Sequence, residues 1–513
     1  MWVPPMSTAI TLPMQLIIHA AAARFWESRL PMGQPLAAIY NACMKMPRIW
    51  STAVVLVMLG LAVAAPVFVS GFWSLRIGNN AIGSGNYGEA AIAFQSAARK
   101  LPWRSELMET AGMAAYTAGS YAYASGLLQT ARDKGVLSAT GWEVLGSALW
   151  AGGSSSSAIS TWLEGSSQYP RHAELWDRLA GAYHEQGDYQ AEQAALLHRL
   201  ELADDAAARY RLALLLMDSD AEGAGEALTG ATALDPDVGP AASTLKAALV
   251  AAASESDTAR RVVVIGRSLG LVEEWALAAR AFARAVEADP TNAEARAWLG
   301  EARQHLDQDG RTDLDAALSL GHNSSVVHTL RGLYWRRQGN LGLSLAEYSR
   351  AAQLEPQNAG LQSLAGEAYA ASGDLVAALQ AYQNAVELAP RQSTYWRLLA
   401  LFCADNDVQV LDVGVAAGLK AVELAPKDAQ ALDALGWAYA RAGYLLKAEQ
   451  PLLKALEVEP NFGLAHLHLG TAYLRWGQND RALEHWNEAV RVDRDGAAGQ
   501  MAAQLLGTYF PQP

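Results

Sequence analysis

The sequence predicts an all-α protein, a helical solenoid of about twelve helix-turn-helix repeats that follows a single N-terminal transmembrane helix. Three observations predict this fold. Small, aromatic and proline residues recur with one dominant period of roughly 34 residues, a length that is typical of stacked repeats. A glycine and a polar residue mark a turn inside most periods, and the N-terminal stretch 49–72 carries no charge. A chain of 513 residues with such a period need not form several unrelated domains.

The uncharged stretch covers residues 49–72 and is bordered by Trp50 on one side and by Phe72 and Trp73 on the other. As a helix it would be about 36 Å long, which is enough to cross a hydrocarbon core of roughly 30 Å. Aromatic residues also favour the two membrane interfaces. A cleaved signal peptide is the alternative, because residues 62–65 have small side chains. Against it, the apolar run is long, Pro66 follows the alanines and the run starts only at residue 49.

The segment before this span, residues 1–48, is expected to be cytoplasmic and partly disordered or interfacial. It contains four bases and one acid, whereas Arg76 is the only base between the span and Arg99, so the positive-inside rule places the solenoid outside the cytoplasm. Residues 8–23 are interpreted as interfacial, with a second span as the alternative. Cys43 precedes the apolar run, which argues against a lipid anchor there. Met46 is an alternative start, so the presence of residues 1–45 in the mature chain stays open.

The repeat is clearest in the two segments that end at Pro390 and Pro460. Equivalent positions carry the same residue in the pairs Gly366/Gly436, Tyr369/Tyr439, Ala378/Ala448 and Ala385/Ala455. The closing position recurs at Pro102, Val136, Pro170, Asp204, Pro236, Pro290, His322, Pro356, Pro390, Pro426, Pro460 and Arg494. Most neighbours in this series are one period apart, but Pro236 and Pro290 lie much further apart, which leaves room for one inserted helix.

Each period has the chemistry of two helices joined by a tight turn. Glycine can end the first helix in the left-handed conformation, and a following Asp, Asn or Ser can cap the second helix, as in Gly187-Asp188 and Gly373-Asp374. Alanine and glycine let the two helices approach closely, and proline ends the second helix because it cannot continue it. Most of the aromatic and alanine residues therefore serve the architecture.

This pattern resembles the tetratricopeptide repeat (TPR) family, in which W-x2-L-G-x2-Y is followed by A, F, A and P. Trp142, Leu145 and Gly146 occupy the pattern in one repeat, and Leu469 and Gly470 in the last. The resemblance covers residues 71–496 and implies a right-handed solenoid. It implies TPR repeats 1–5 over residues 73–238, an inserted helix or joint over 239–258, repeats 6–12 over 259–496, and a capping helix and tail over 497–513.

Composition and motifs argue against catalytic activity and against nucleic acid as a partner. The net charge of −13 divides into +4 for residues 1–76 and −17 for residues 77–513, so the repeats do not favour phosphate backbones. Residues 83–88 fit GxGxxG but read as the turn of the first repeat, without the strand that a dinucleotide loop needs. His466 and His468 are two residues apart, a poor spacing for metal ligands on a helix. We therefore predict no enzyme activity, no catalytic residues, no cofactor, no metal and no small-molecule substrate.

A possible binding surface is the face of each first helix that lies opposite its packing face. This face is apolar with a basic edge, and the predicted protein-binding residues are Leu333, Arg336, Arg337, Arg397, Leu401, Trp437, Arg441, Leu467, Leu474 and Arg475. Some TPR proteins hold a terminal carboxylate in a Lys/Asn clamp, but the corresponding positions here include Glu367 and Asp433. An amphipathic helix or an extended apolar segment fits better. The alternative is that Trp437 and Leu467 pack between repeats.

These features favour a membrane-anchored scaffold that binds protein partners and supports the assembly of a membrane or envelope complex. Two alternatives stay open. One is an accessory or regulatory subunit of an envelope polysaccharide or glycan-transfer machine, and the other is a fixed subunit of an energy-transducing membrane complex. An enzyme with a dispersed site would need a closed pocket that gathers acids and histidines. Separately, Asn323-Ser324-Ser325 has the spacing of a glycan acceptor, which would be used only in a secretory context.

Overall fold

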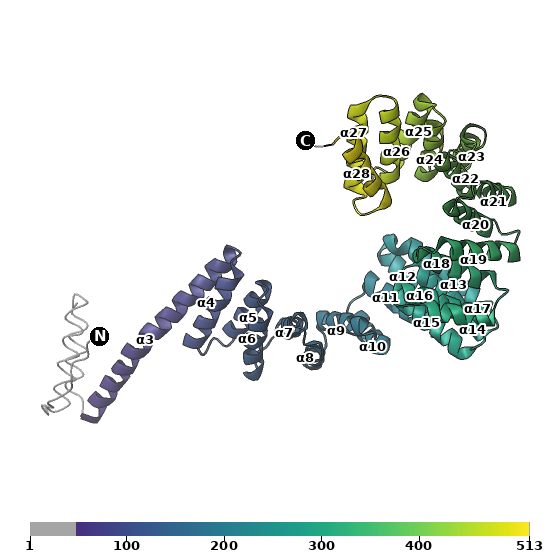
Figure 1. Ribbon diagram of the computed structural model, residues 1–513. Coiled ribbons are helices and arrows are strands. Elements are labelled where there is room, and N and C mark those ends of the chain that lie inside the picture. Colours follow the sequence, from purple (N-terminus) through teal and green to yellow (C-terminus); the bar gives the residue numbers. More distant parts are fainter. Residues whose placement is uncertain (1–47, 512–513) are drawn as a thin grey trace, which may run out of the picture. The chain divides into compact units, whose positions relative to one another are not determined.

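The computed structural model describes residues 48–511, and this part of the chain forms 26 α-helices and no strand (Figure 1). The chain divides into two compact units, Met1–Asp204 and Asp205–Pro513, and each is an array of antiparallel helix pairs. The predicted all-α repeat solenoid is therefore confirmed. The predicted cytoplasmic segment lies outside the described residues except for Arg48, as do Cys43 and the stretch 8–23.

The first unit contains four helix pairs in its described part. We call the first helix of a pair the A helix and the second the B helix. The pairs are α3 (Arg48–Gly83) with α4 (Tyr87–Lys100), α5 (Leu107–Thr117) with α6 (Tyr121–Asp133), α7 (Ala139–Ala151) with α8 (Ser155–Gln168), and α9 (Ala173–Gln186) with α10 (Tyr189–Leu202). Each helix packs on the next one in the chain, and the A helices α5, α7 and α9 also contact one another in succession.

The second unit contains eight further pairs, one unpaired helix and a closing helix. The pairs are α11 (Ala206–Leu216) with α12 (Ala221–Leu234), α14 (Thr258–Leu271) with α15 (Trp275–Ala288), α16 (Ala293–His305) with α17 (Arg311–Leu320), α18 (Ser325–Arg337) with α19 (Leu341–Leu354), α20 (Ala359–Ser372) with α21 (Leu375–Leu388), α22 (Ser393–Asn406) with α23 (Val415–Leu424), α24 (Ala429–Arg441) with α25 (Leu445–Val458), and α26 (Gly463–Arg475) with α27 (Asn479–Val492). The unpaired helix is α13 (Gly239–Ala253), preceded by the short turn η1 (Pro236–Val238), and the closing helix is α28 (Ala497–Tyr509).

The turn between an A helix and its B helix is built as the glycine-polar pair predicts. Gly187 has a φ angle of 71° and Gly373 one of 86°, in the left-handed region that glycine reaches without a steric cost. Asp188 then accepts a hydrogen bond from the backbone N–H of Ala191 at 3.1 Å, which caps α10. After α14, α16 and α22, the non-glycine residues Glu273, Asp307 and Asp407 adopt positive φ angles of 65°, 56° and 59°.

Small residues in the A helices are required by the closeness of the B helices. A Cβ atom added to Gly470 would lie 2.5 Å from Cδ1 of Trp486, and one added to Gly78 would lie 2.7 Å from Cε1 of Phe94. Both rings are buried almost completely, so the glycine hydrogen provides the space in which the ring packs. These contacts explain why glycine and alanine alternate with aromatic residues at fixed positions of the repeat.

The pair α22 and α23 departs from the regular repeat. A π-helical turn, η2 (Val410–Gly414), joins the two helices, and Asp407 and Gln409 before it have φ angles of 59° and 44°. This turn accommodates the slightly longer period between Pro390 and Pro426. Cys403 packs beside Gly414 in the core, and burial raises the pKa of its thiol to about 12, so this cysteine is a packing residue.

The predicted membrane span coincides with the N-terminal two thirds of α3. The side chains of residues 49–56, 58, 59 and 61–64 lie outside the described set. Over the described residues, no helix has an apolar run long enough to cross a bilayer.

Candidate protein-binding face

The A helices α22, α24 and α26 contact one another in succession and carry most of the predicted binding residues. Positions four residues apart on a helix lie on one face, so Arg397 and Leu401 share a face of α22 with Asp405, and Trp437 and Arg441 share a face of α24 with Asp433. His468 of α26 joins them through direct contacts. We call this set the A-helix row: Arg397, Leu401, Asp405, Asp433, Trp437, Arg441 and His468.

Trp437 links three A helices at the centre of this row. Its Nε1 donates a hydrogen bond to Oδ1 of Asp405 on α22 at 2.7 Å. On the other side its ring stacks on the imidazole of His468 on α26, with the ring centroids 4.3 Å apart and the planes 5° apart. The Trp437 side chain is only 8% exposed, so its contribution to the face is mainly to hold the helices in register.

Asp433 is a buried carboxylate whose hydrogen-bond partner lies in the next repeat. It is 1% exposed, and Nδ1 of His468 lies 2.9 Å from its Oδ1. A carboxylate cannot be buried at this depth without a hydrogen-bond partner, so Nδ1 of His468 carries the hydrogen and donates it. Two hydrogen bonds, Asp405–Trp437 and His468–Asp433, and the ring stack between Trp437 and His468 therefore join three A helices. We call this set of contacts the fixed polar connection.

Three arginines on or beside the A-helix row retain capacity for a ligand. The guanidinium of Arg441 lies over the Trp437 ring at 5.6 Å and 3.8 Å from Oδ1 of Asp407, but its Nε is buried without a hydrogen-bond partner. Arg397 is half-buried and Arg475 is exposed, and neither forms a hydrogen bond or ion pair with the described residues. Guanidinium groups of this kind bind carboxylates in bidentate fashion.

The predicted residues of α18 serve mainly as ties between repeats. Both nitrogens Nη1 and Nη2 of Arg337 donate to the carboxylate of Glu301 on α16 at 2.8 Å, and Arg336 donates to Oε1 of Glu367 on α20 at 2.6 Å. Leu333 is half-buried. The carboxylates of the neighbouring A helices therefore neutralise the two arginines that the sequence places on the basic edge of α18.

Leu467 and Leu474 of α26 lie beneath the closing helix. Leu467 is 8% exposed and belongs to a buried cluster with Trp486, while Leu474 packs against the edge of that cluster. Helix α28 contributes Ala498 and Ala502 to the same cluster. Leu467 therefore packs as a core residue, and Leu474 is half-buried at the edge of the core. Leu467 and Trp437 both pack against neighbouring helices, as the alternative expectation describes.

Three members of the A-helix row were not among the predicted binding residues: Asp405, Asp433 and His468. Leu467 occupies the position of the repeat that corresponds to Asp433, one residue before the histidine that actually pairs with Asp433. A charged residue on an apolar A helix is the signal that could have found this pair, because such a residue needs a partner from the next repeat.

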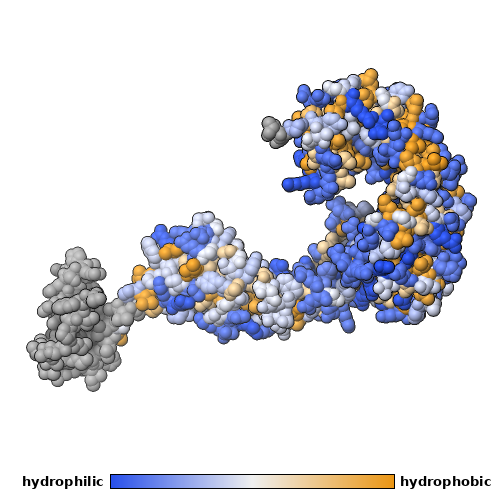
Figure 2. Space-filling view, viewed as in Figure 1, coloured by the Kyte–Doolittle hydropathy of each residue, from blue (hydrophilic) through white to orange (hydrophobic). Residues whose placement is uncertain are grey.

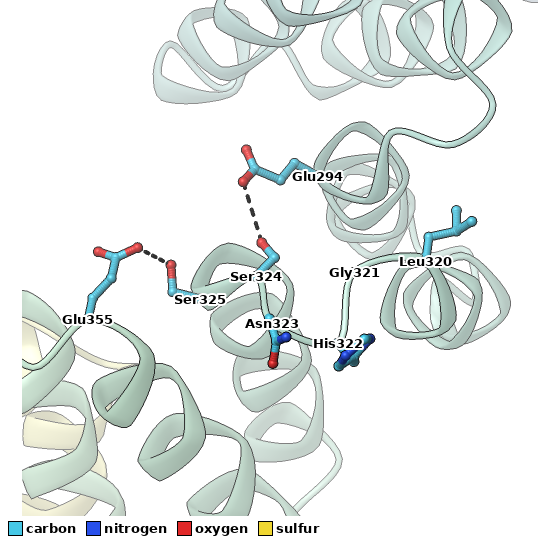
Figure 3. A pocket seen from close by; sticks show the side chains of 8 residues that line it. All are labelled: Glu294, Leu320, Gly321, His322, Asn323, Ser324, Ser325 and Glu355. Carbon is cyan, nitrogen blue, oxygen red and sulfur yellow. Dashed lines mark hydrogen bonds between the residues drawn. The ribbon is translucent and has the colours of Figure 1, made fainter.

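A shallow hollow lined by polar residues lies at the turn between α17 and α18 (Figure 3). Ser324 caps α18 through Val327 N–H at 3.3 Å and donates to Oε1 of Glu294 at 3.4 Å, and Ser325 donates to Glu355. These hydrogen bonds account for the serines as structural residues. The side-chain carbonyl of Asn323 accepts a hydrogen bond from Arg350 at 3.0 Å, and the glycan at this position stays a prediction.

Two histidines contact each other between α26 and α27, the last helix pair of the solenoid. Nδ1 of His466 on α26 is 3.1 Å from Nδ1 of His485 on α27, and Nε2 of His466 is 3.3 Å from the carbonyl oxygen of Pro460. The carbonyl only accepts, so the hydrogen of His466 is assigned to Nε2, and Nδ1 of His466 accepts from His485. Both rings are neutral in this arrangement, and burial lowers the pKa of each histidine below 6.5.

We expect acidification to loosen the last repeat. Because the folded pKa values of His466 and His485 are depressed, the unfolded chain binds protons first as the pH falls below about 6.5, and stability is lost toward the lower folded pKa. His328 has the opposite sign, because its hydrogen bond to Glu347 raises its pKa, so its contribution is present at low pH and is lost as the pH rises through the folded pKa. Amide hydrogen exchange at pH 7 and pH 5, corrected for intrinsic rates, should show α26 and α27 losing protection on acidification. Greater protection of α26 and α27 at pH 5 would contradict the assignment, and His485→Gln should reduce the effect.

Comparison with known proteins agrees with the repeat architecture. Residues 109–166 and 329–393 match the tetratricopeptide repeat family. Over 213 residues the chain is 22% identical to the human mitochondrial import receptor subunit TOM70, a match that covers 39% of this chain and only 34% of that protein. Among solved structures, the yeast Tom70 is 15% identical over 85% of this chain and 95% of that chain with a TM-score of 0.37. The Cut9-Hcn1 hetero-tetramer of APC/C is 13% identical over 85% and 96% with a TM-score of 0.41.

The antiparallel pairs and the contacts between successive A helices define a helical-repeat protein. Two stretches of these repeats match the tetratricopeptide repeat family, in agreement with the sequence pattern. Proteins of this architecture bind other proteins through extended surfaces formed by successive repeats.

Proposed function

We propose that this protein is a scaffold that binds a protein partner on the A-helix row of α22, α24 and α26 and holds it at a membrane. The observation that carries the proposal is the coexistence of a fixed polar connection, from Asp405 to Asp433, with the unsatisfied guanidinium groups of Arg397 and Arg475 and the partly unsatisfied one of Arg441. A rigid row of this kind loses little entropy when it binds. The proposal assigns no reaction, cofactor or metal to the chain.

The partner is proposed to be an amphipathic helix or an extended segment in which apolar side chains are flanked by carboxylates. Leu401 is half-buried and supplies apolar contact, and the arginines on either side supply positive charge. The repeats carry a net negative charge, so a local basic edge favours acidic groups that the remainder of the surface repels. The likeness to an import receptor subunit is compatible with a chain that binds proteins.

Membrane attachment is proposed through residues 49–72, with the N-terminus in the cytoplasm, the solenoid on the other side and the assembly of a membrane or envelope complex as the role. The uncharged run and the basic residues before it support this part of the proposal. The full chain should stay with the membrane after an alkaline carbonate wash and require detergent for release. Release by carbonate would contradict the anchor. A solenoid that resists added protease in intact cells, but is cut after lysis, would contradict the orientation.

We expect reversal of the basic edge to weaken partner binding strongly. The double variant Arg397→Glu, Arg475→Glu would place like charges against the partner's carboxylates, and such contacts cost several kcal/mol, or roughly a hundredfold in affinity. The measurement is a titration of the full chain in detergent with the partner that co-purifies with it.

The matched control is Lys427→Glu, Lys454→Glu, which changes the net charge equally at positions between α22 and α26 in the sequence but outside the A-helix row. Both lysines are exposed. Equal losses in the two double variants would show a general charge effect, and unchanged binding of the first variant would remove the A-helix row as the binding face.

A further inference from the structure

Helix α3 serves both the predicted span and the first repeat without interruption. Its C-terminal part buries Gly71, Ser74, Gly78 and Ala81 against α4, at the spacing of one helix face. A Cβ atom on Gly71 would lie 2.8 Å from Cγ of Leu101, so close packing begins at this glycine. The repeat therefore starts at the level where the predicted span ends, with no linker between them.

The end of α4 brings a further aromatic ring to this level. Because α4 runs back along α3, the turn after Lys100 places Trp103 against Phe68, with the ring centroids 4.8 Å apart in an edge-to-face arrangement. Trp103 is still 54% exposed, and Phe72 and Trp73 of α3 are 52% and 63% exposed. The visible surface of α3 carries apolar residues beside the described end of the chain (Figure 2).

Basic side chains lie at the same level as these rings. Arg99 is exposed and makes no ion pair with the described residues, and Lys100 donates to Oγ of Ser74 at 3.4 Å. Arg76 lies over the Trp73 ring at 5.9 Å. Arg104 follows Trp103 and pairs with Glu106, the only acid in residues 99–106. In the sequence, Arg76 is the only base that closely follows the predicted span. In the folded structure, Arg99, Lys100 and Arg104 also lie near the end of the span.

Exposed tryptophan and phenylalanine combined with basic residues have the chemistry that favours a membrane interface. The aromatic rings prefer the level of the lipid headgroups, and each nearby base is attracted to anionic lipids. The part of α3 from Arg48 to Pro66 would then span about 29 Å, which matches a hydrocarbon core of roughly 30 Å.

We infer that Val67, Val69, Phe72 and Trp73 of α3, together with residues 99–104, form a collar that seats the first repeat on the headgroup layer of a bilayer containing anionic lipid. This inference rests on the proposed membrane anchor. The collar fixes the angle at which the first repeat leaves the membrane, because α3 is held at two points, by the bilayer around the span and by the headgroups around Trp103.

The test places a nitroxide spin label at Ser105→Cys or Val69→Cys in the full chain with Cys43→Ser, reconstituted in vesicles of phosphatidylcholine and phosphatidylglycerol. Both side chains are exposed, and neither belongs to the packing of α4. The control label is at Leu163→Cys, which is exposed on α8 of the third repeat. Power saturation then compares contact with oxygen, which enters lipid, and with a water-soluble nickel chelate.

The collar predicts that labels at 69 and 105 lose access to the nickel chelate in vesicles, while the label at 163 keeps it. If the chain floats with the vesicles but the label at 105 stays in water, the collar is wrong and the anchor stands. If the chain does not float with the vesicles, the anchor and the collar both fail. A label at 105 that is shielded equally in vesicles and in detergent would show that protein covers this surface, which also overturns the inference.

Discussion

Replacing Trp486 by alanine is expected to lower the stability of the last repeat by about 3–5 kcal/mol, the usual effect of emptying a large buried site. The indole is completely buried, and Nε1 donates to the carbonyl oxygen of Leu467 at 3.2 Å. It packs on Gly470 and lies 6.0 Å from the rings of Tyr509 and Phe510, so it joins α26, α27 and the residues at the end of α28. Its loss removes the core on which α28 rests.

In a repeat protein this effect should remain local, because each repeat contacts only its neighbours. Amide hydrogen exchange should therefore show α26, α27 and α28 losing protection, while helices α14 to α19 keep theirs. The variant Trp486→Phe retains a ring but loses the hydrogen bond, and should cost only about 1–2 kcal/mol. Unchanged protection of α28 in Trp486→Ala would contradict its role as a cap on this cluster.

Replacing Arg337 by alanine is expected to lower the free energy of unfolding by about 3 kcal/mol, because it leaves the buried carboxylate of Glu301 without its cation. The sequence predicts a binding role for this arginine, but the structure gives it this structural one. Its guanidinium makes two hydrogen bonds to Glu301, whose side chain is 4% exposed. Such a loss is far more costly than that of a surface ion pair. The nearby His305, 3.1 Å from Glu301, offsets part of the loss.

Arg336 provides a matched control on the same helix. It pairs with Glu367, and the two side chains are 41% and 52% exposed, so Arg336→Ala should cost less than about 1 kcal/mol. Urea unfolding of the two full-length variants, followed by hydrogen exchange in α16 and α18, measures the difference. Equal effects of the two variants would mean that burial of Glu301 does not decide the energy of its ion pair.

The repeat fold could be predicted from the sequence because its signals are local. The left-handed turn at Gly373, the cap at Asp374 and the close contact between Gly470 and Trp486 each involve residues whose spacing within one repeat is fixed. Consistent local preferences of this kind specify a fold. The π-helical turn at Val410–Gly414 could not be predicted in the same way, because a slightly longer period can be accommodated in several ways.

The candidate site was predicted only in part, because it depends on contacts between repeats. The helical period placed Arg397, Leu401 and Trp437 on the A-helix face, but the rotation of α26 about its axis decides whether Leu467 or His468 meets α24. A sequence pattern does not give that rotation. The same applies to Arg337, whose partner on α16 belongs to the preceding repeat.

Binding of a protein partner to the A-helix row of α22, α24 and α26 should be detectable by site-specific photo-crosslinking of the full chain in cells. A photoreactive amino acid replaces Arg397 on the row or Arg475 beside it, or Val376 or Leu446, which are 82% and 73% exposed on the B helices α21 and α25. We expect one discrete crosslinked protein from positions 397 and 475 and none from positions 376 and 446. Crosslinks from the B-helix positions alone, or from none of the four positions, would contradict it.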